Sequence, residues 1–414
     1  MLFFGMKEKP GTVICNSHCF TYPSNIGKKI NLEPHCQSSH AKVLMKKTHK
    51  RKRILFITPY PRGRAPSQRF RFEQYYHLLN THDFEIQQQS YLSTDNWKLF
   101  QTQGYLLQKL SALLVGLAKR IQSLASIRSF DYVFIHREAA PVGPPIFEWL
   151  AARIFRKRII FDFDDAIWLT DNINEGVIGR KIKFRKKIGL TCRWSYKVSC
   201  GNTYLIEYAK QFNNNVQLNP TTVDSIDYHN PKRFDKASLR TQEGVSGIVI
   251  GWTGSHSTLK YLESIQKTLQ EIENTNRNVH FLVIADKPPK LRLKNLIFKK
   301  WTASNEVSDL MLADIGIMPL PNDEWTKGKC GFKILQYMAL EIPSIASNVG
   351  INGQIIESGV NGYLCSTESD WLDALNKLIS SAELRNKIGK TGRVTVTNHY
   401  SLSANSENFL KLFE

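Results

Sequence analysis

Residues 323–347 decide the fold and read DEWTKGKCGFKILQYMALEIPSIAS. A short apolar run at residues 315–319 precedes this stretch. The stretch itself predicts a loop rich in Gly and Lys, a helix that starts near Gly331, and a short strand that ends at Ser347. This order is typical of a parallel sheet with a crossover helix. Backbone amides at the start of such a helix bind anions, and Lys329 and Lys333 add positive charge beside them.

Apolar runs of the same kind recur on both sides of this stretch. Short, buried-type strands are predicted at residues 54–58, 131–136, 158–162, 246–251, 279–285, 315–319 and 343–346. Helical spacing is found at residues 70–79, 145–155, 259–273 and 333–340. Alternating strands and helices predict parallel sheets joined by right-handed crossovers.

The predicted strands fall into two sets, separated by a polar stretch at residues 224–247. We therefore predict an α/β protein with two Rossmann-like domains that face an interdomain cleft. The predicted domains are an acceptor domain at 50–235 and a donor domain at 236–399. A C-terminal helix at 400–414 is expected to pack back on the first domain, and residues 1–49 to form a disordered basic extension. Ligands bind beyond the carboxyl ends of parallel strands, so the chemistry is expected in the loops that follow the strands.

The amino-acid composition indicates which kinds of partner and which cellular compartment to expect. The 414 residues are 42% hydrophobic and 22% charged, an ordinary globular composition. The seven cysteines contain no C-x-x-C pair, which indicates neither a disulfide framework nor a zinc site. A net charge of +20 indicates an anionic partner, and nucleic acid, a phosphorylated substrate and an acidic lipid surface all meet that condition. With no long apolar run and no signal-like start, we expect no membrane-spanning helix and a cytoplasmic protein.

Two loops of the first domain carry candidate site residues. The loop at residues 59–71 is basic and contains Arg69, so it is either an anion-binding loop or a solvated one. His136 and Arg137 end a predicted strand and precede a proline-rich turn that fixes their side chains. A histidine at such a position is either a structural group or a functional one, and we interpret His136 as functional.

Acidic and glycine-containing loops follow two further strands. Asp162, Asp164 and Asp165 either bind a metal or cap the next element, and we interpret the cluster without a metal. A paired-carboxylate hydrolase is a further possibility for this cluster. In the second half, Gly254 and Ser255 allow backbone amides to approach a phosphate. Lys260 then completes a pyrophosphate clamp, or is only a solvated charge.

The segment from residue 325 to residue 364 resembles the donor-binding half of the retaining family 4 (group 1) glycosyltransferases, which have the GT-B fold. Residues 336–347, QYMALEIPSIAS, match the family's Glu-Ala-Met-Ala-x-Gly-x-Pro-Val-Val-Ala-Ser signature. Residues 219–224 resemble its Pro-x-Gly-Val-Asp linker, and residues 254–260 its Gly-Arg-x4-Lys phosphate loop. The resemblance covers about residues 50–400.

The departures from the family pattern concern charged groups. The family's paired glutamates fall on Gly328 and Gln336, and its phosphate-loop arginine falls on Ser255. Gln336 is expected to hold the donor ribose, since an amide both donates and accepts hydrogen bonds. Glu324, Lys329 or backbone amides are the candidates to replace the glutamate missing at position 328.

The resemblance implies transfer of a sugar from a nucleoside diphosphate to an acceptor hydroxyl with retention, in cell-surface polysaccharide or glycolipid synthesis. Amides at Gly331 and Phe332, with Lys333, Lys329 and Lys260, are expected to stabilise the leaving diphosphate, so that no metal cofactor is required. His136 is assigned to positioning the sugar and Arg69 to the donor phosphates. The expected partners are the nucleotide sugar and a sugar or lipid-linked acceptor, without nucleic acid.

Two other classes of function remain open. A nucleic-acid-binding or scaffold protein fits the positive charge, and a sugar-nucleotide epimerase fits the same fold. Residues 105–126 form a leucine-rich helix and residues 180–187 are strongly basic. They either dock on an anionic inner-membrane face, or the helix packs on the N-terminal sheet.

Overall fold

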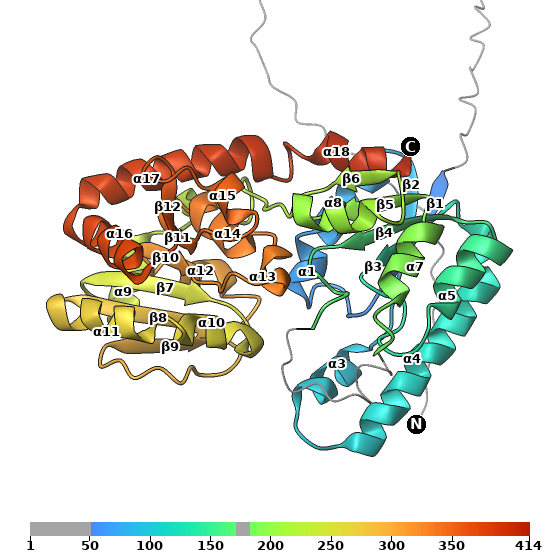
Figure 1. The fold of residues 1–414 in the computed structure, drawn as a ribbon, viewed down its shortest axis with the longest axis horizontal. Coiled ribbons are helices and arrows are strands. Elements are labelled where there is room, and N and C mark those ends of the chain that lie inside the picture. The colour runs from blue at the N-terminus through green and yellow to red at the C-terminus, as the bar shows by residue number, and fades with distance from the viewer. Residues whose placement is uncertain (1–50, 171–182) are drawn as a thin grey trace, which may run out of the picture. The chain divides into compact units, whose positions relative to one another are not determined.

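The computed structural model describes residues 51–170 and 183–414. Within these residues the chain forms two parallel six-stranded sheets with flanking helices (Figure 1). This confirms the predicted fold class of two Rossmann-like domains. The expectation for residues 1–49, and part of the basic run at 180–187, lie outside the described residues.

The first sheet has the strand order β2-β1-β3-β4-β5-β6. Its strands are β1 (Lys52–Thr58), β2 (Phe84–Ser90), β3 (Tyr132–His136), β4 (Arg158–Phe163), β5 (Lys197–Cys200) and β6 (Val216–Leu218). The central strands are apolar on both faces because helices cover both, and every residue of β3 is buried. In the parallel register, His136 lies opposite Asp162 at the ends of β3 and β4.

Helices connect these strands. They are α1 (Pro66–Arg69), α2 (Tyr76–Thr81), α3 (Thr94–Gln101), α4 (Leu106–Ser126), α5 (Ile146–Trp149), α7 (Lys187–Trp194) and α8 (Thr203–Lys210). Short 3-10 turns lie at η1 (Glu73–Tyr75) and η2 (Ile127–Ser129), and a π-helical turn, η3 (Leu150–Ile154), extends α5.

The second sheet has the strand order β12-β11-β10-β7-β8-β9. Its strands are β7 (Ile248–Thr253), β8 (Val279–Ala285), β9 (Leu296–Lys300), β10 (Ile315–Met318), β11 (Ser344–Ser347) and β12 (Gly362–Cys365). The order reverses between β7 and β10, so the loops after these two strands diverge and leave space for a ligand beyond their carboxyl ends.

The helices of the second half surround this sheet (Figure 1). They are α9 (Lys236–Gln242), α10 (Leu259–Glu263), α11 (Gln266–Thr275), α12 (Glu306–Leu310), α13 (Glu324–Lys327), α14 (Phe332–Ala339), α15 (Asn352–Ile355), α16 (Glu368–Ser380) and α17 (Ala382–Thr395). Short turns lie at η4 (Pro231–Arg233) and η5 (His256–Thr258).

The end of the chain returns to the first sheet. After α17, the π-helical turn η6 (Val396–Tyr400) leads to α18 (Ser406–Leu410) and η7 (Lys411–Phe413). Phe409 is fully buried and stacks on Tyr75 with ring centroids 4.1 Å apart. Ser401 pairs with Val223, where the chain leaves the first domain. The two strand sets are therefore connected twice, once near residue 223 and once near residue 401.

Three helical predictions differ in detail. The helix expected at 70–79 is broken into η1 and α2, and the helix expected at 259–273 into α10 and α11. The helix expected at 145–155 changes to a π-helical turn after Trp149. In each case the apolar spacing is helical, but local hydrogen bonding interrupts the regular ladder.

One helix bears on the expectation that no helix spans a membrane. Residues 106–129 form a helix long and apolar enough to cross a membrane by length and composition, with a mean hydropathy of 1.3. The apolar stretch is interrupted by Lys109, Lys119 and Arg120, which hid it from a search for uninterrupted apolar residues. Only 28% of its most apolar window is buried, which leaves much of the helix facing outward.

Candidate functional site

Loops from both domains meet around a small pocket of about 180 Å³. It lies beyond the carboxyl ends of β3 and β4 on one side and β10 on the other. Its charged lining residues are Arg137, Asp164, Asp165, Lys329 and Lys333. Four of the predicted site residues line this pocket: Lys329, Gly331, Phe332 and Lys333.

The start of α14 supplies backbone donors to this pocket. Gly331 precedes the helix with φ of 68°, a left-handed conformation that glycine adopts without strain. A Cβ at this position would lie 2.3 Å from Ile355 Cδ1, so another residue would have to displace this side chain as well as adopt the positive φ. No side chain caps the helix and its first turn has no acidic residue. The positive end of α14 is therefore suited to an anion.

Two lysines flank the same helix start. Lys329 Nζ lies 2.9 Å from Asp165 Oδ1 and 4.9 Å from the centre of the Trp325 ring. Lys333 Nζ lies 5.4 Å from the centre of the Trp252 ring. Burial, reinforced by the positive charge of Lys329, lowers the pKa of Lys333 to about 8. An anion bound in the pocket would offset the repulsion between the Lys329 and Lys333 ammonium groups.

A carboxylate pair from the first domain faces these lysines. Arg137 Nε donates to Asp164 Oδ1 at 2.8 Å, and its Nη2 donates to Asp165 Oδ2 at 2.6 Å. Arg137 has φ of 60°, which is uncommon for a residue with a side chain and typical of constrained sites. Burial raises the pKa of Asp165, but the charges of Lys329 and Arg137 outweigh it and hold the pKa below its usual value.

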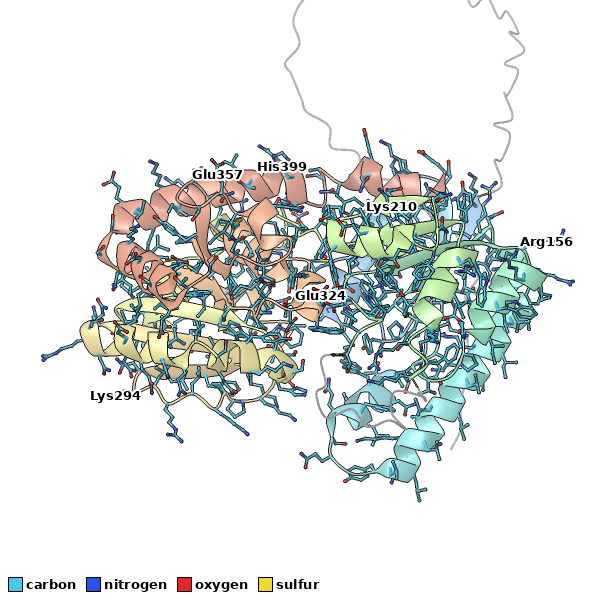
Figure 2. All side chains as sticks on the ribbon, viewed as in Figure 1. Arg156, Lys210, Lys294, Glu324, Glu357 and His399 are labelled. Carbon is cyan, nitrogen blue, oxygen red and sulfur yellow. The ribbon has the colours of Figure 1, made fainter. Side chains whose placement is uncertain are left out.

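The position of the family's first glutamate is closed to any side chain. A Cβ on Gly328 would lie 2.7 Å from both the amide nitrogen and the Cβ of Ala166. Asp165 immediately precedes Ala166, so the loop that excludes a glutamate here brings its own carboxylate to Lys329. Glu324, a predicted substitute, is exposed at the start of α13 (Figure 2), where its carboxylate accepts from Tyr204 of α8 at 2.8 Å and from Lys327 at 2.6 Å.

His136 lies at the end of β3, but inside the protein. Its Nδ1 is 2.8 Å from Asp162 Oδ2, and the same carboxylate is bound by Arg71. Burial raises the pKa of Asp162, but Arg71 and His136 hold it well below its usual range. His136 Nε2 is buried and has no partner among the described residues. The assignment of His136 to the transferred sugar stays a prediction.

Gln336, predicted to hold the ribose, lies in a second buried cluster. Its Nε2 donates to Glu306 Oε1 at 3.3 Å. Glu306 Oε2 accepts from Arg69 at 2.7 Å and from Tyr228 at 2.9 Å. Burial, together with the nearby positive charge of Arg69, lowers the pKa of His229 beside Gln336 to about 3, so this imidazole is neutral. Arg69 thus contacts a carboxylate of the second domain.

The predicted phosphate loop follows β7. The Gly254 amide donates to Ile284 O at 3.0 Å, and Ser255 Oγ lies 2.8 Å from Ser257 Oγ. Lys260 lines a pocket of about 550 Å³, together with Ser257, Trp325 and Arg137. Arg137 lines both this pocket and the smaller one beside α14. The structure therefore brings Lys260, Lys329 and Lys333 around Arg137, while Gly254 and Ser255 line neither pocket.

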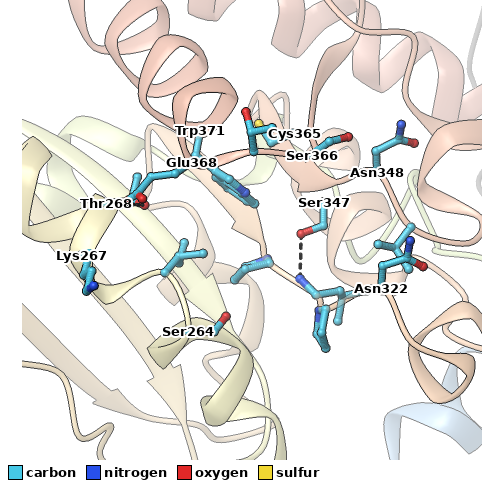
Figure 3. A pocket seen from close by; sticks show the side chains of 16 residues that line it. Ser264, Lys267, Thr268, Asn322, Ser347, Asn348, Cys365, Ser366, Glu368 and Trp371 are labelled. Carbon is cyan, nitrogen blue, oxygen red and sulfur yellow. Dashed lines mark hydrogen bonds between the residues drawn. The ribbon is translucent and has the colours of Figure 1, made fainter.

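A third pocket, of about 410 Å³, lies within the second domain (Figure 3). It is formed by the ends of β10, β11 and β12 and the junction of α10 with α11. The Leu320 amide donates to Ser347 Oγ at 2.9 Å across it. It contains none of the predicted site residues.

The acidic cluster after β4 is divided among separate partners. Asp162 binds Arg71 and His136, whereas Asp164 and Asp165 bind Arg137. Within residues 51–170 and 183–414, no group of three His, Cys, Asp or Glu side chains is arranged to hold a metal ion. Sequence reasoning named Asp165 as a metal ligand or cap and missed its pairing with Lys329, and it missed Glu306 altogether, since both residues act across the domain boundary.

Two Rossmann-like domains whose loops converge on the start of α14 define the GT-B architecture. Solved structures share this fold over most of the chain. Sucrose-phosphate synthase from Thermosynechococcus elongatus has a TM-score of 0.65 at 12% identity, covering 88% of this chain and 98% of its own. HepE from Anabaena, in complex with UDP and glucose, has a TM-score of 0.63 at 14% identity, covering 88% and 99%.

The family is given by the sequence of the second domain. Residues 247–381 match the family model described as "Glycosyl transferases group 1", which is the family that the sequence resembles. Spore coat protein SA from Bacillus subtilis is 34% identical over 80 residues, 19% of this chain. The match spans about a fifth of that relative's length, 21%.

Proposed function

We propose that this protein is a glycosyltransferase that moves a sugar from a nucleoside diphosphate sugar to an acceptor hydroxyl, with retention. The observation that carries the proposal is the uncapped start of α14, flanked by Lys329 and Lys333, in a pocket shared by both domains. The match of residues 247–381 to the group 1 family model and the bound UDP and glucose of the similarly folded HepE support it.

The diphosphate of the donor binds at the start of α14 in this proposal. The Phe332 and Lys333 amides and the Lys329 and Lys333 ammonium groups bind its oxygens, and Lys260 approaches from the loop after β7. Negative charge on the diphosphate grows as the bond to the sugar breaks. Donors already in place for that charge lower the barrier without a required metal ion.

Asp165 takes the place of the carboxylate that the family has at position 328. Its side chain is held by Arg137 and Lys329, so it stays ionised beside the transferred sugar. The departing phosphate oxygen accepts the proton of the acceptor hydroxyl, so no separate base is needed. His136 orders this region through Asp162, and Gln336 with Glu306 faces the ribose.

The acceptor is a sugar or a lipid-linked sugar, and the reaction serves cell-surface polysaccharide or glycolipid synthesis in the cytoplasm. A thermal-shift screen of the full chain against UDP, GDP, ADP and their sugars tests the donor. A ligand that binds the native state raises its unfolding temperature by mass action. We expect one nucleotide class to give a clear rise that Lys333→Ala removes.

The matched control is Lys390→Ala, which removes an exposed lysine from α17. It is expected to respond like the native chain. If no nucleotide or nucleotide sugar shifts the unfolding temperature, or if Lys333→Ala responds fully, the proposed donor site is wrong. Product analysis with the donor that binds then separates transfer to an acceptor from isomerisation of the donor, the reaction of an epimerase.

A further inference from the structure

The outer face of α4 is apolar and open to solvent. Leu107, Leu110, Leu114, Leu117 and Ile121 follow each other at intervals of three and four residues, so they form one stripe along the helix. Their exposed fractions range from 48% to 78%. A continuous apolar surface of this kind on a folded protein marks an interaction site.

The opposite face of α4 fixes the helix to the first domain. A Cβ on Gly116 would lie 2.3 Å from the ring of Tyr91, so the helix approaches this ring closely. The buried Arg120 donates to the carbonyl oxygens of Ala139 at 2.7 Å and Thr58 at 2.8 Å. If the helix crossed a bilayer, these hydrogen bonds would be lost. The helix is therefore built to lie on a surface rather than to span one.

The neighbouring element extends this surface. α5 packs against α4, and its residues Ile146 and Trp149 are exposed, as is Ile154 in η3 (Figure 1). Tryptophan favours the boundary between water and lipid because its ring is apolar and its N–H is polar. Packing on the sheet and docking on a membrane are the two alternatives that the sequence leaves for this helix. In the structure α4 packs through one face, and the other face has no partner among residues 51–170 and 183–414.

Basic residues outnumber acidic ones around the apolar stripe, although Asp95 and Asp131 flank it. Residues 96–130 contain no Asp or Glu, and neither do residues 149–161. Arg128, Arg153 and Arg156 are exposed at the edge of the surface, and Figure 2 shows the Arg156 side chain extending away from the domain. Two copies of this face would repel each other, whereas anionic lipid head groups would neutralise it.

We propose that the face formed by α4, α5 and η3 docks this protein on an anionic bilayer surface, with the leucine stripe in the head-group region and the arginines on lipid phosphates. The proposal stands on this face alone and does not rest on the proposed transferase activity. Basic residues each add to the attraction of an anionic leaflet, and the apolar side chains add the burial that holds the protein there.

The test is flotation of the full chain with vesicles of phosphatidylcholine, with and without phosphatidylglycerol. We expect the native chain to float with the anionic vesicles and to bind the neutral ones much more weakly. Replacing three leucines together, Leu107→Ser, Leu110→Ser and Leu114→Ser, should lower binding roughly tenfold or more. The control variant carries Ile226→Ser, Val360→Ser and Val394→Ser, three equally exposed apolar residues elsewhere. It should bind like the native chain.

Two further measurements make the flotation result conclusive. The leucine variant should unfold at the native temperature, and the pair Arg153→Ser with Arg156→Ser should weaken binding to anionic vesicles without altering the leucines. The proposal is overturned if the native chain does not bind anionic vesicles, or if the control variant loses as much binding as the leucine variant. A concentration-dependent dimer that the leucine variant abolishes, without vesicle binding, would instead identify the face as a contact between copies.

Discussion

The lowered pKa of Lys333 should make binding of the proposed donor depend on pH. Burial and the charge of Lys329 lower the pKa of this ammonium group to about 8 in the unliganded protein. A bound diphosphate favours the charged form and raises this pKa again, so binding takes up a proton at alkaline pH. Affinity should therefore be full below pH 8 and fall as pH rises above it.

The size of the effect follows from proton linkage. With a free pKa of about 8, roughly nine in ten molecules have lost the Lys333 proton at pH 9, and nucleotide affinity should fall about tenfold from pH 7 to pH 9. Calorimetric titration with the nucleoside diphosphate, in two buffers of different ionisation enthalpy, measures both the affinity and the proton uptake.

Lys333→Arg is the matched variant, because arginine stays charged throughout this range while the ligand's own ionisation is unchanged. It should bind with little change in affinity between pH 7 and pH 9. A native affinity that is flat over this range would refute the reasoning, and so would an arginine variant that keeps the tenfold fall.

Three further predictions concern the carboxylates and the domain contact. Asp165→Asn should lower turnover roughly a hundredfold while leaving the affinity for the nucleoside diphosphate nearly unchanged. Glu324→Gln, at the exposed start of α13, should leave both turnover and affinity unchanged. Steady-state kinetics measures the turnover of each variant, and titration measures its affinity. Gly328→Ala should cost about 1–3 kcal/mol of unfolding free energy through its clash with Ala166, while Gly353→Ala, whose new Cβ meets only Asn348 Oδ1 at 3.1 Å, should cost less. Equal thermal shifts for the two would argue against the close approach at Gly328. Arg71→Met should cost about 3–5 kcal/mol in urea unfolding because it removes the buried guanidinium that pairs with the Asp162 carboxylate. Arg53→Met, which breaks an ion pair of partly exposed side chains, should cost less than about 1 kcal/mol, and a similar loss in both would contradict the account.

Most central strands were predictable from the sequence because their burial on both faces leaves a continuous apolar run. The interior strand β5 was missed, because it is buried but reads KVSC. β8 was predicted at its observed bounds, residues 279–285, and β3 within one residue. The edge strands β2 and β9 were missed, since one face of each is open and polar residues interrupt the run, as in FEIQQQS. A strand that is buried on one face only lacks the continuous apolar run by which the central strands were recognised.

The candidate site was predictable only in part. A helix start preceded by Gly331 and flanked by Lys329 and Lys333 is a local feature, so sequence pattern located it. Asp165 and Lys329 are 164 residues apart, and only the folded chain brings them together. The same holds for Arg69 and Glu306, 237 residues apart.

His136 shows the limit of placing a side chain from its strand. Its position at the carboxyl end of β3 was predicted, but a strand's end does not reveal whether the ring faces the pocket or the interior. The ring turns inward because Asp162, its neighbour in the register, offers a buried carboxylate. Leucines on α4 illustrate the reverse case, because helical spacing predicts a face but not what covers it.

The central claim is that the start of α14, with its two lysines, binds the donor diphosphate. Calorimetric titration of the native chain and of the double variant Lys329→Ala, Lys333→Ala, with the nucleoside diphosphate that stabilises the protein most, tests it directly. Losing two charge-assisted contacts should weaken binding by roughly a hundredfold or more. A double variant that binds the nucleotide with native affinity would contradict the account.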